Sequence, residues 1–78
     1  MSNLAKYNQT FIETFEIGEN DLPALAYQSI AAWDSVGHMS LMTALEGIFD
    51  IMFEMDDILD FSSYEKGKSI LAKYQVAI

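Results

Sequence analysis

Apolar residues recur at helical spacing in three stretches of the chain, and no stretch alternates apolar and polar residues as a half-buried strand would. The clearest stretch spans residues 35–52, and residues 3–16 and 64–74 show the same spacing. Between them, residues 56–60 suit one short helix or a turn. We therefore predict an all-α fold, a small bundle of three principal helices plus one short helix.

The predicted helix over residues 35–52 has a buried face and an outer face. Residues within about 40° of Leu41 on a helical wheel form the expected buried stripe. This stripe consists of Leu41, Leu45, Ile48 and Met52. The outer face is apolar near its start and acidic toward its end, and it carries Val36, Met39, Thr43, Glu46 and Asp50.

Capping residues indicate where two of these helices begin. Asp34 is a good N-cap for the helix that follows it, because its carboxylate can accept a hydrogen bond from a free backbone N–H. Ser62 and Glu65 fit a capping box at the start of the last helix, with Ser62 as the cap. Residues 18–33 form a connection that is long for a compact domain, and such loops are often functional. The residues expected to hold it against the core are Leu22, Leu25, Tyr27 and Ile30.

The acidic charge balance narrows the range of partners. The chain has 12 Asp and Glu against 4 Lys, with a formal net charge of −8. Such a surface is repelled by nucleic-acid phosphates and by anionic membranes, and it suits a basic protein partner. The 78 residues include no cysteine and no membrane-length apolar run, so we expect one domain over residues 1–78 without disulfides or membrane insertion. No signal-peptide pattern is visible, and we expect a cytoplasmic monomer.

One short segment, residues 33–39, contains the polar side chains best placed to carry chemistry. Ser35 follows the long connection and opens a helix, where free backbone N–H groups and the helix dipole favour a phosphate. Taken alone, an Asp-Ser pair before a helix is far more often a simple cap than a modification site. A catalytic triad of Ser35, His38 and Asp34 is rejected, because adjacent residues at a helix start cannot easily orient one another as a triad requires.

Several short motifs along the chain resemble those of the acyl carrier protein family. Asp34-Ser35-Val36 resembles the Asp-Ser-Leu signature that opens the second helix of the family. Three further motifs resemble the family's Leu-Glu, Phe-Asp and Ile-Thr-Thr motifs, namely Leu45-Glu46, Phe49-Asp50 and Phe61-Ser62-Ser63. The resemblance covers most of the chain, and size, acidity and helix order agree with it.

This resemblance implies a non-catalytic carrier that is the substrate of a phosphopantetheinyl transferase. The transferase would attach 4′-phosphopantetheine from coenzyme A to Ser35, with Asp34 as the preceding motif residue and helix cap. The thiol of this arm would carry an acyl or aminoacyl group as a thioester. The carrier would deliver it to loading and transferring enzymes that have basic docking surfaces. The positions that match the family's partner contacts are Val36, Met39, Glu46 and Asp50.

Two positions depart from the family pattern. Gly37 and Ser40 stand where the family often has acids, which weakens the expectation of fatty-acid-synthase partners. A glycine inside a helix costs about 1 kcal/mol relative to alanine, so we expect the arm or a partner to approach closely at Gly37. The Asp-Ser-x-Gly pattern is also similar to discrete carriers outside fatty-acid synthesis, including those for D-alanine. The alternative function is a small acidic interaction module, an adaptor or inhibitor, without covalent modification.

No metal site is predicted. The acids nearest to one another, Asp56, Asp57 and Asp60, lack the spacing and the glycine of a calcium loop. Four methionines are expected to be packing residues, and in a carrier they could also let the core adapt to an acyl chain. They are Met39, Met42, Met52 and Met55.

Overall fold

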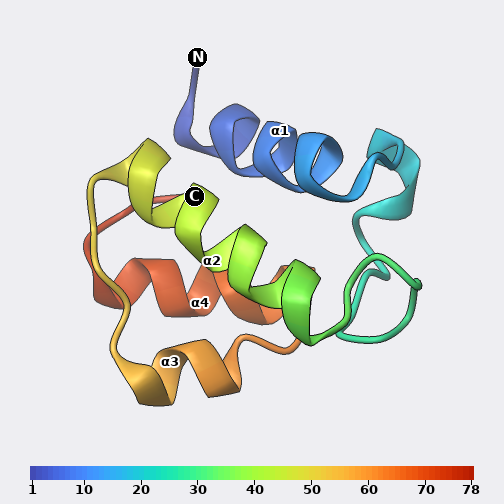
Figure 1. Ribbon diagram of the computed structural model, residues 1–78. Coiled ribbons are helices and arrows are strands. Elements are labelled where there is room, and N and C mark those ends of the chain that lie inside the picture. Colours follow the sequence, from blue (N-terminus) through green and yellow to red (C-terminus); the bar gives the residue numbers. More distant parts are fainter.

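The computed structural model describes residues 1–78, and all its regular elements are helical. They are α1 (Asn3–Phe15), the 3₁₀-helix η1 (Glu19–Asp21), α2 (Ser35–Phe49), α3 (Met55–Asp60) and α4 (Tyr64–Lys73). Figure 1 shows α2 crossing diagonally in front of α4, with α1 along the upper side and α3 along the lower side. The predicted all-α bundle of three principal helices and one short helix is confirmed. No helix is both long enough and apolar enough to cross a bilayer.

The predicted cap of α2 is confirmed, whereas that of α4 is wrong by one residue. The Gly37 N–H donates to Asp34 Oδ1 over 2.8 Å. At α4 the cap is Ser63 instead of Ser62, and Ser63 Oγ accepts from the Lys66 N–H. The reason is tertiary: the Ser62 carbonyl accepts from the Tyr27 N–H, and this pairing to the long connection keeps Ser62 outside the helix.

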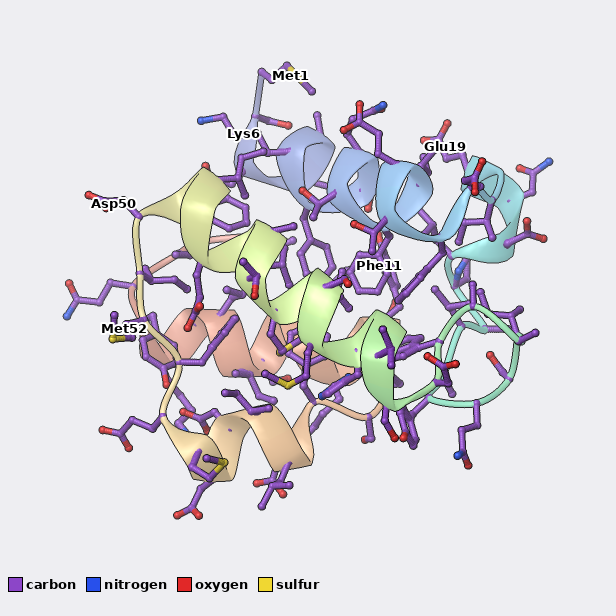
Figure 2. All side chains as sticks on the ribbon, viewed as in Figure 1. Met1, Lys6, Phe11, Glu19, Asp50 and Met52 are labelled. Carbon is purple, nitrogen blue, oxygen red and sulfur yellow. The ribbon has the colours of Figure 1, made fainter.

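The predicted end of α2 is also wrong, because the helix stops at Phe49 instead of continuing to residue 52. Asp50 takes the left-handed conformation, with φ of 54°, so the chain turns away from the helix axis. Leu41 and Leu45 are fully buried, as their spacing predicts. Ile48 is 43% exposed and Met52 is 81% exposed, contrary to the prediction. Figure 2 shows Met52 projecting away from the protein at the turn that follows α2.

Aromatic rings fill the centre of the bundle. Phe11 of α1 is fully buried, and its ring centroid lies 4.9 Å from that of Tyr7, 5.6 Å from Trp33 and 5.5 Å from Tyr64. Edge-to-face pairs of this kind add to the free energy gained by burying the rings. Figure 2 shows Phe11 pointing from α1 into the interior. The core thus joins α1, α4 and the end of the long connection.

The long connection lies against this core. Leu22 and Leu25 are buried in it, and Tyr27 and Ile30 are partly buried against it, so the predicted anchoring of the connection is confirmed. The connection also bonds to the start of α4, where the Tyr64 N–H donates to the Leu25 carbonyl over 2.9 Å. These anchors place the last residues of the connection beside the first turn of α2.

Candidate functional site

Ser35 is the first residue of α2, and its side chain is exposed. The Gly37 N–H is taken by the Asp34 carboxylate, and the His38 N–H donates to the Asp34 carbonyl. The N–H groups of Ser35 and Val36 have no acceptor within the protein. Because these groups lie at the positive end of a helix, they can bind an anionic group attached to the Ser35 hydroxyl.

Tyr27 reaches Ser35 from the long connection. The two hydroxyl oxygens are 3.1 Å apart, within hydrogen-bond distance, and either can be the donor. From the sequence, Tyr27 is predicted only as a packing residue. Neither helical spacing nor a cap relates these two residues, which lie eight positions apart in different structural contexts. The contact depends on how the connection folds back over the core.

Both ring nitrogens of His38 bond to groups other than Ser35. The indole N–H of Trp33 donates to His38 Nδ1 over 2.9 Å, and since an indole nitrogen can only donate, Nδ1 must be the acceptor. The proton of the neutral ring then lies on Nε2, which is 2.7 Å from the Ile58 carbonyl and donates to it. With both ring nitrogens engaged, His38 has no free base directed at the Ser35 hydroxyl. Instead, it joins the first turn of α2 to α3.

Gly37 makes a close contact, but not with a ligand. A Cβ atom at this position would lie 1.9 Å from the Ala32 carbonyl oxygen and 3.3 Å from the Phe15 ring. The close approach that the sequence leads us to expect from the arm or a partner is therefore made by the chain's own connection. Glycine is required here so that the connection can turn directly into α2.

A hollow of about 370 Å³ opens beside Ser35. It lies between the start of α2, α3 and the connection, and most of its lining is apolar. The lining residues are Tyr27, Ser35, His38, Met39, Met55, Ile58, Leu59, Phe61 and Ser62. A second, more open depression runs from Ser35 along the outer face of α2, and Val36, Ser40, Thr43 and Ala44 contribute to it. Ser35 thus borders two surfaces on which a flexible group could lie.

The predicted partner contacts fall into two groups. Val36 is 77% exposed and Met39 is about half exposed, so the apolar start of the outer face is present. Glu46 is predicted to lie on the exposed outer face, but it is partly buried. Its carboxylate accepts a hydrogen bond from the Phe53 N–H over 2.9 Å. Asp50 is exposed but lies just beyond the helix, as its C-cap.

The exposed apolar surface continues from α2 onto α3, which helical spacing within α2 does not predict. Met55 and Leu59 are both mostly exposed, and both line the hollow. A six-residue helix has too few turns for its spacing to indicate which side is covered. The apolar surface around Ser35 is therefore wider than the sequence suggests.

The acids of α3 do not converge on a common point. Asp57 is buried and bonds to Lys73 Nζ and to the Tyr74 hydroxyl, each over 2.5 Å. The hydrogen bond from Lys73, followed by that from Tyr74, holds the pKa of Asp57 below its ordinary value of 3.8. Asp56 and Asp60 are exposed. No group of three His, Cys, Asp or Glu side chains is arranged to hold a metal ion.

No protein-family model matches this chain, and no curated protein or solved structure shows significant similarity to it.

Proposed function

We propose that this protein is a carrier protein of the acyl carrier type, which bears a 4′-phosphopantetheine arm on Ser35. The observation that carries the proposal is the setting of this hydroxyl. It is exposed on the first turn of α2, it lies beside two unpartnered backbone N–H groups, and it borders an apolar hollow. The motif resemblance described above adds to this local argument.

In the loading reaction, the Ser35 oxygen forms a bond to the phosphorus that bears the pantetheine group of coenzyme A. The pyrophosphate P–O bond breaks, and adenosine 3′,5′-bisphosphate leaves. The hydroxyl proton passes to a base that the transferase supplies, because His38 is bonded elsewhere. The N–H groups of Ser35 and Val36 then face the phosphodiester anion. The bound arm supplies a thiol that holds cargo as a thioester.

The surface around Ser35 fits partners with a basic rim and an apolar centre. Val36, Met39 and Leu59 are exposed near the attachment point, and the chain as a whole carries a formal charge of −8. The apolar side chains would bury area against a partner, while the negative field would speed the approach of a basic one. The partners are the transferase and the enzymes that load and unload the arm. Glu46 and Asp50 remain proposed docking acids.

The hollow supports an acyl cargo more than an aminoacyl one. Its walls are mainly Met39, Met55, Ile58, Leu59 and Phe61, which can shield an apolar chain from water. Methionine side chains adapt readily to such a chain. A charged ammonium group would find no carboxylate among the lining residues.

The test is incubation of the folded protein with coenzyme A and a phosphopantetheinyl transferase of broad specificity, followed by intact mass measurement. We expect the addition of one phosphopantetheine group to the wild type and to Ser40→Ala, and none to Ser35→Ala. Ser40 is the matched control, because it is an exposed serine on the same helix. Absence of addition to the folded wild type, or addition to Ser35→Ala, would refute the proposal.

The second candidate is an unmodified acidic interaction module, an adaptor or inhibitor. The observation that favours it is the exposed apolar surface of Val36, Met39, Met55 and Leu59, which exists without any arm. Such a module would bind its basic partner equally well with Ser35→Ala, but Val36→Asp would weaken the binding. A carrier would lose acyl transfer with Ser35→Ala.

A further inference from the structure

Tyr27 lies on only one of the two surfaces that meet at Ser35, the hollow and the outer depression of α2. It lines the hollow between α2 and α3, and it makes no part of the depression on the outer face of α2. Its hydroxyl is the only side-chain group bonded to the Ser35 hydroxyl. A group attached to Ser35 therefore meets, on the side of the hollow, a hydroxyl already within bonding distance of Ser35, whereas the hydroxyls of the outer depression, on Ser40 and Thr43, make no bond to Ser35.

The Tyr27 hydroxyl is held in place by the surrounding structure. The ring lies edge-on to Trp33, with centroids 6.4 Å apart, and edge-on to His38, with centroids 5.5 Å apart. Its backbone N–H donates to the Ser62 carbonyl. Both rings that support Tyr27 are themselves joined by the Trp33–His38 hydrogen bond. A group fixed in this way loses little conformational freedom when it binds a neighbour.

A phosphodiester on Ser35 would gain from a further hydrogen-bond donor, because the nearby Asp34 carboxylate is also negative. The Asp34 carboxylate already accepts from the Gly37 N–H, and its negative charge opposes a second anion beside it. Once Ser35 is esterified, its oxygen has no hydrogen, so Tyr27 can only be the donor in any bond between them. A phenol donating to an anionic oxygen makes a stronger bond than one between neutral groups.

We infer that the Tyr27 hydroxyl donates a hydrogen bond to the phosphodiester on Ser35 and thereby directs the arm into the hollow between α2 and α3. This inference rests on the proposed function. It makes Tyr27 a positioning residue of the loaded protein, without a part in the transfer chemistry. The outer face of α2, where Val36 is a proposed partner contact, then stays uncovered by the arm.

The experiment compares loaded wild type with loaded Tyr27→Phe, which keeps the ring and removes only the hydroxyl. The readouts are the ³¹P shift of the phosphodiester and the methyl shifts that loading causes at Met55 and Ala44. Met55 lines only the hollow, and Ala44 lines only the outer depression. Tyr64→Phe is the matched control, since its hydroxyl bonds Asn8 away from Ser35.

We expect loading to shift the Met55 methyl in wild type and in Tyr64→Phe, with little effect at Ala44. Tyr27→Phe should change the ³¹P shift and lower the ratio of arm in the hollow to arm outside by about tenfold, as for the loss of one hydrogen bond to a charged group. The same methyl pattern and ³¹P shift in Tyr27→Phe as in wild type would overturn the inference while leaving the carrier proposal intact.

A measurement on the wild type alone covers the case in which Tyr27→Phe does not fold or load. A heteronuclear Overhauser contact between the phosphorus and the ring protons of Tyr27 is expected, and its absence overturns the inference. If the folded wild type takes no phosphopantetheine at all, the carrier proposal fails and the inference fails with it.

Discussion

Helices α1 and α3 are attached to the rest of the protein by different kinds of interaction. The buried side chains of α1 are Tyr7, Thr10, Phe11 and Phe15, most of which belong to the aromatic core. The one buried side chain of α3 is an acid, Asp57. Figure 1 shows the two helices on opposite sides of the α2 and α4 pair. Helix α1 is thus held mainly by buried apolar area, whereas α3 is held by polar contacts and by Ile58, which is only partly buried against the core.

The polar contacts of α3 come from two neighbouring helices. Asp57 bonds to Lys73 and Tyr74 at the end of α4, and the Ile58 carbonyl accepts from His38 on α2. Each contact depends on direction, so a small displacement weakens it more than it would weaken an apolar contact. Because α3 forms one wall of the hollow beside Ser35, we predict that α3 opens more readily than α1, which is anchored in the aromatic core.

The largest effect is expected from Phe11→Ala, which removes the centre of the aromatic side. Loss of a fully buried phenylalanine costs about 3–5 kcal/mol, a large share of the stability of so small a domain. Urea unfolding followed by circular dichroism measures the change. Leu4→Ala is the control on the same helix, since Leu4 is 39% exposed and should have a much smaller effect. Equal losses of unfolding free energy in the two variants would contradict the conclusion that buried aromatic side chains hold α1 in place.

A smaller and more local effect is expected from Asp57→Asn. The amide cannot form the ion pair with Lys73, and one of its two acceptor positions becomes a donor. Amide hydrogen exchange in α3 should accelerate by about tenfold, as when a charge-assisted hydrogen bond is weakened, while α1 keeps its protection. Asp56→Asn is the control, because Asp56 is exposed on the same helix. Uniform acceleration across all helices would show that α3 does not open independently.

The smallest expected effect is the pH dependence of the contribution that Asp57 makes to the free energy of unfolding. The pKa of Asp57 in the folded protein lies below its ordinary value of 3.8, so folding favours the carboxylate. Its contribution is therefore fully present above that ordinary value and is lost as the pH falls through the lowered one. The stability difference between wild type and Asp57→Asn should shrink over this range, as measured by urea unfolding at several pH values. A constant difference would contradict this linkage.

The predictions that rest on short-range patterns agree with the structure best. Helical spacing gives the all-α class and the burial of Leu41 and Leu45, and capping chemistry gives Asp34 at the start of α2. The spacing argument fails at Ile48 and Met52, because α2 ends at Phe49 and the chain turns at Asp50. The cap of α4 shifts to Ser63 because residues far away in the sequence pair with Ser62.

The sequence by itself determined where Ser35 lies on its helix and how negative its surroundings are, because caps and helical periodicity depend on residues within one or two turns. The tertiary structure alone decided that Tyr27 meets Ser35, that His38 turns to Trp33 and Ile58, and that α3 closes a hollow beside them. These contacts join different segments of the chain, and helical periodicity does not predict contacts between such segments. They follow from the path that the long connection takes across the aromatic core.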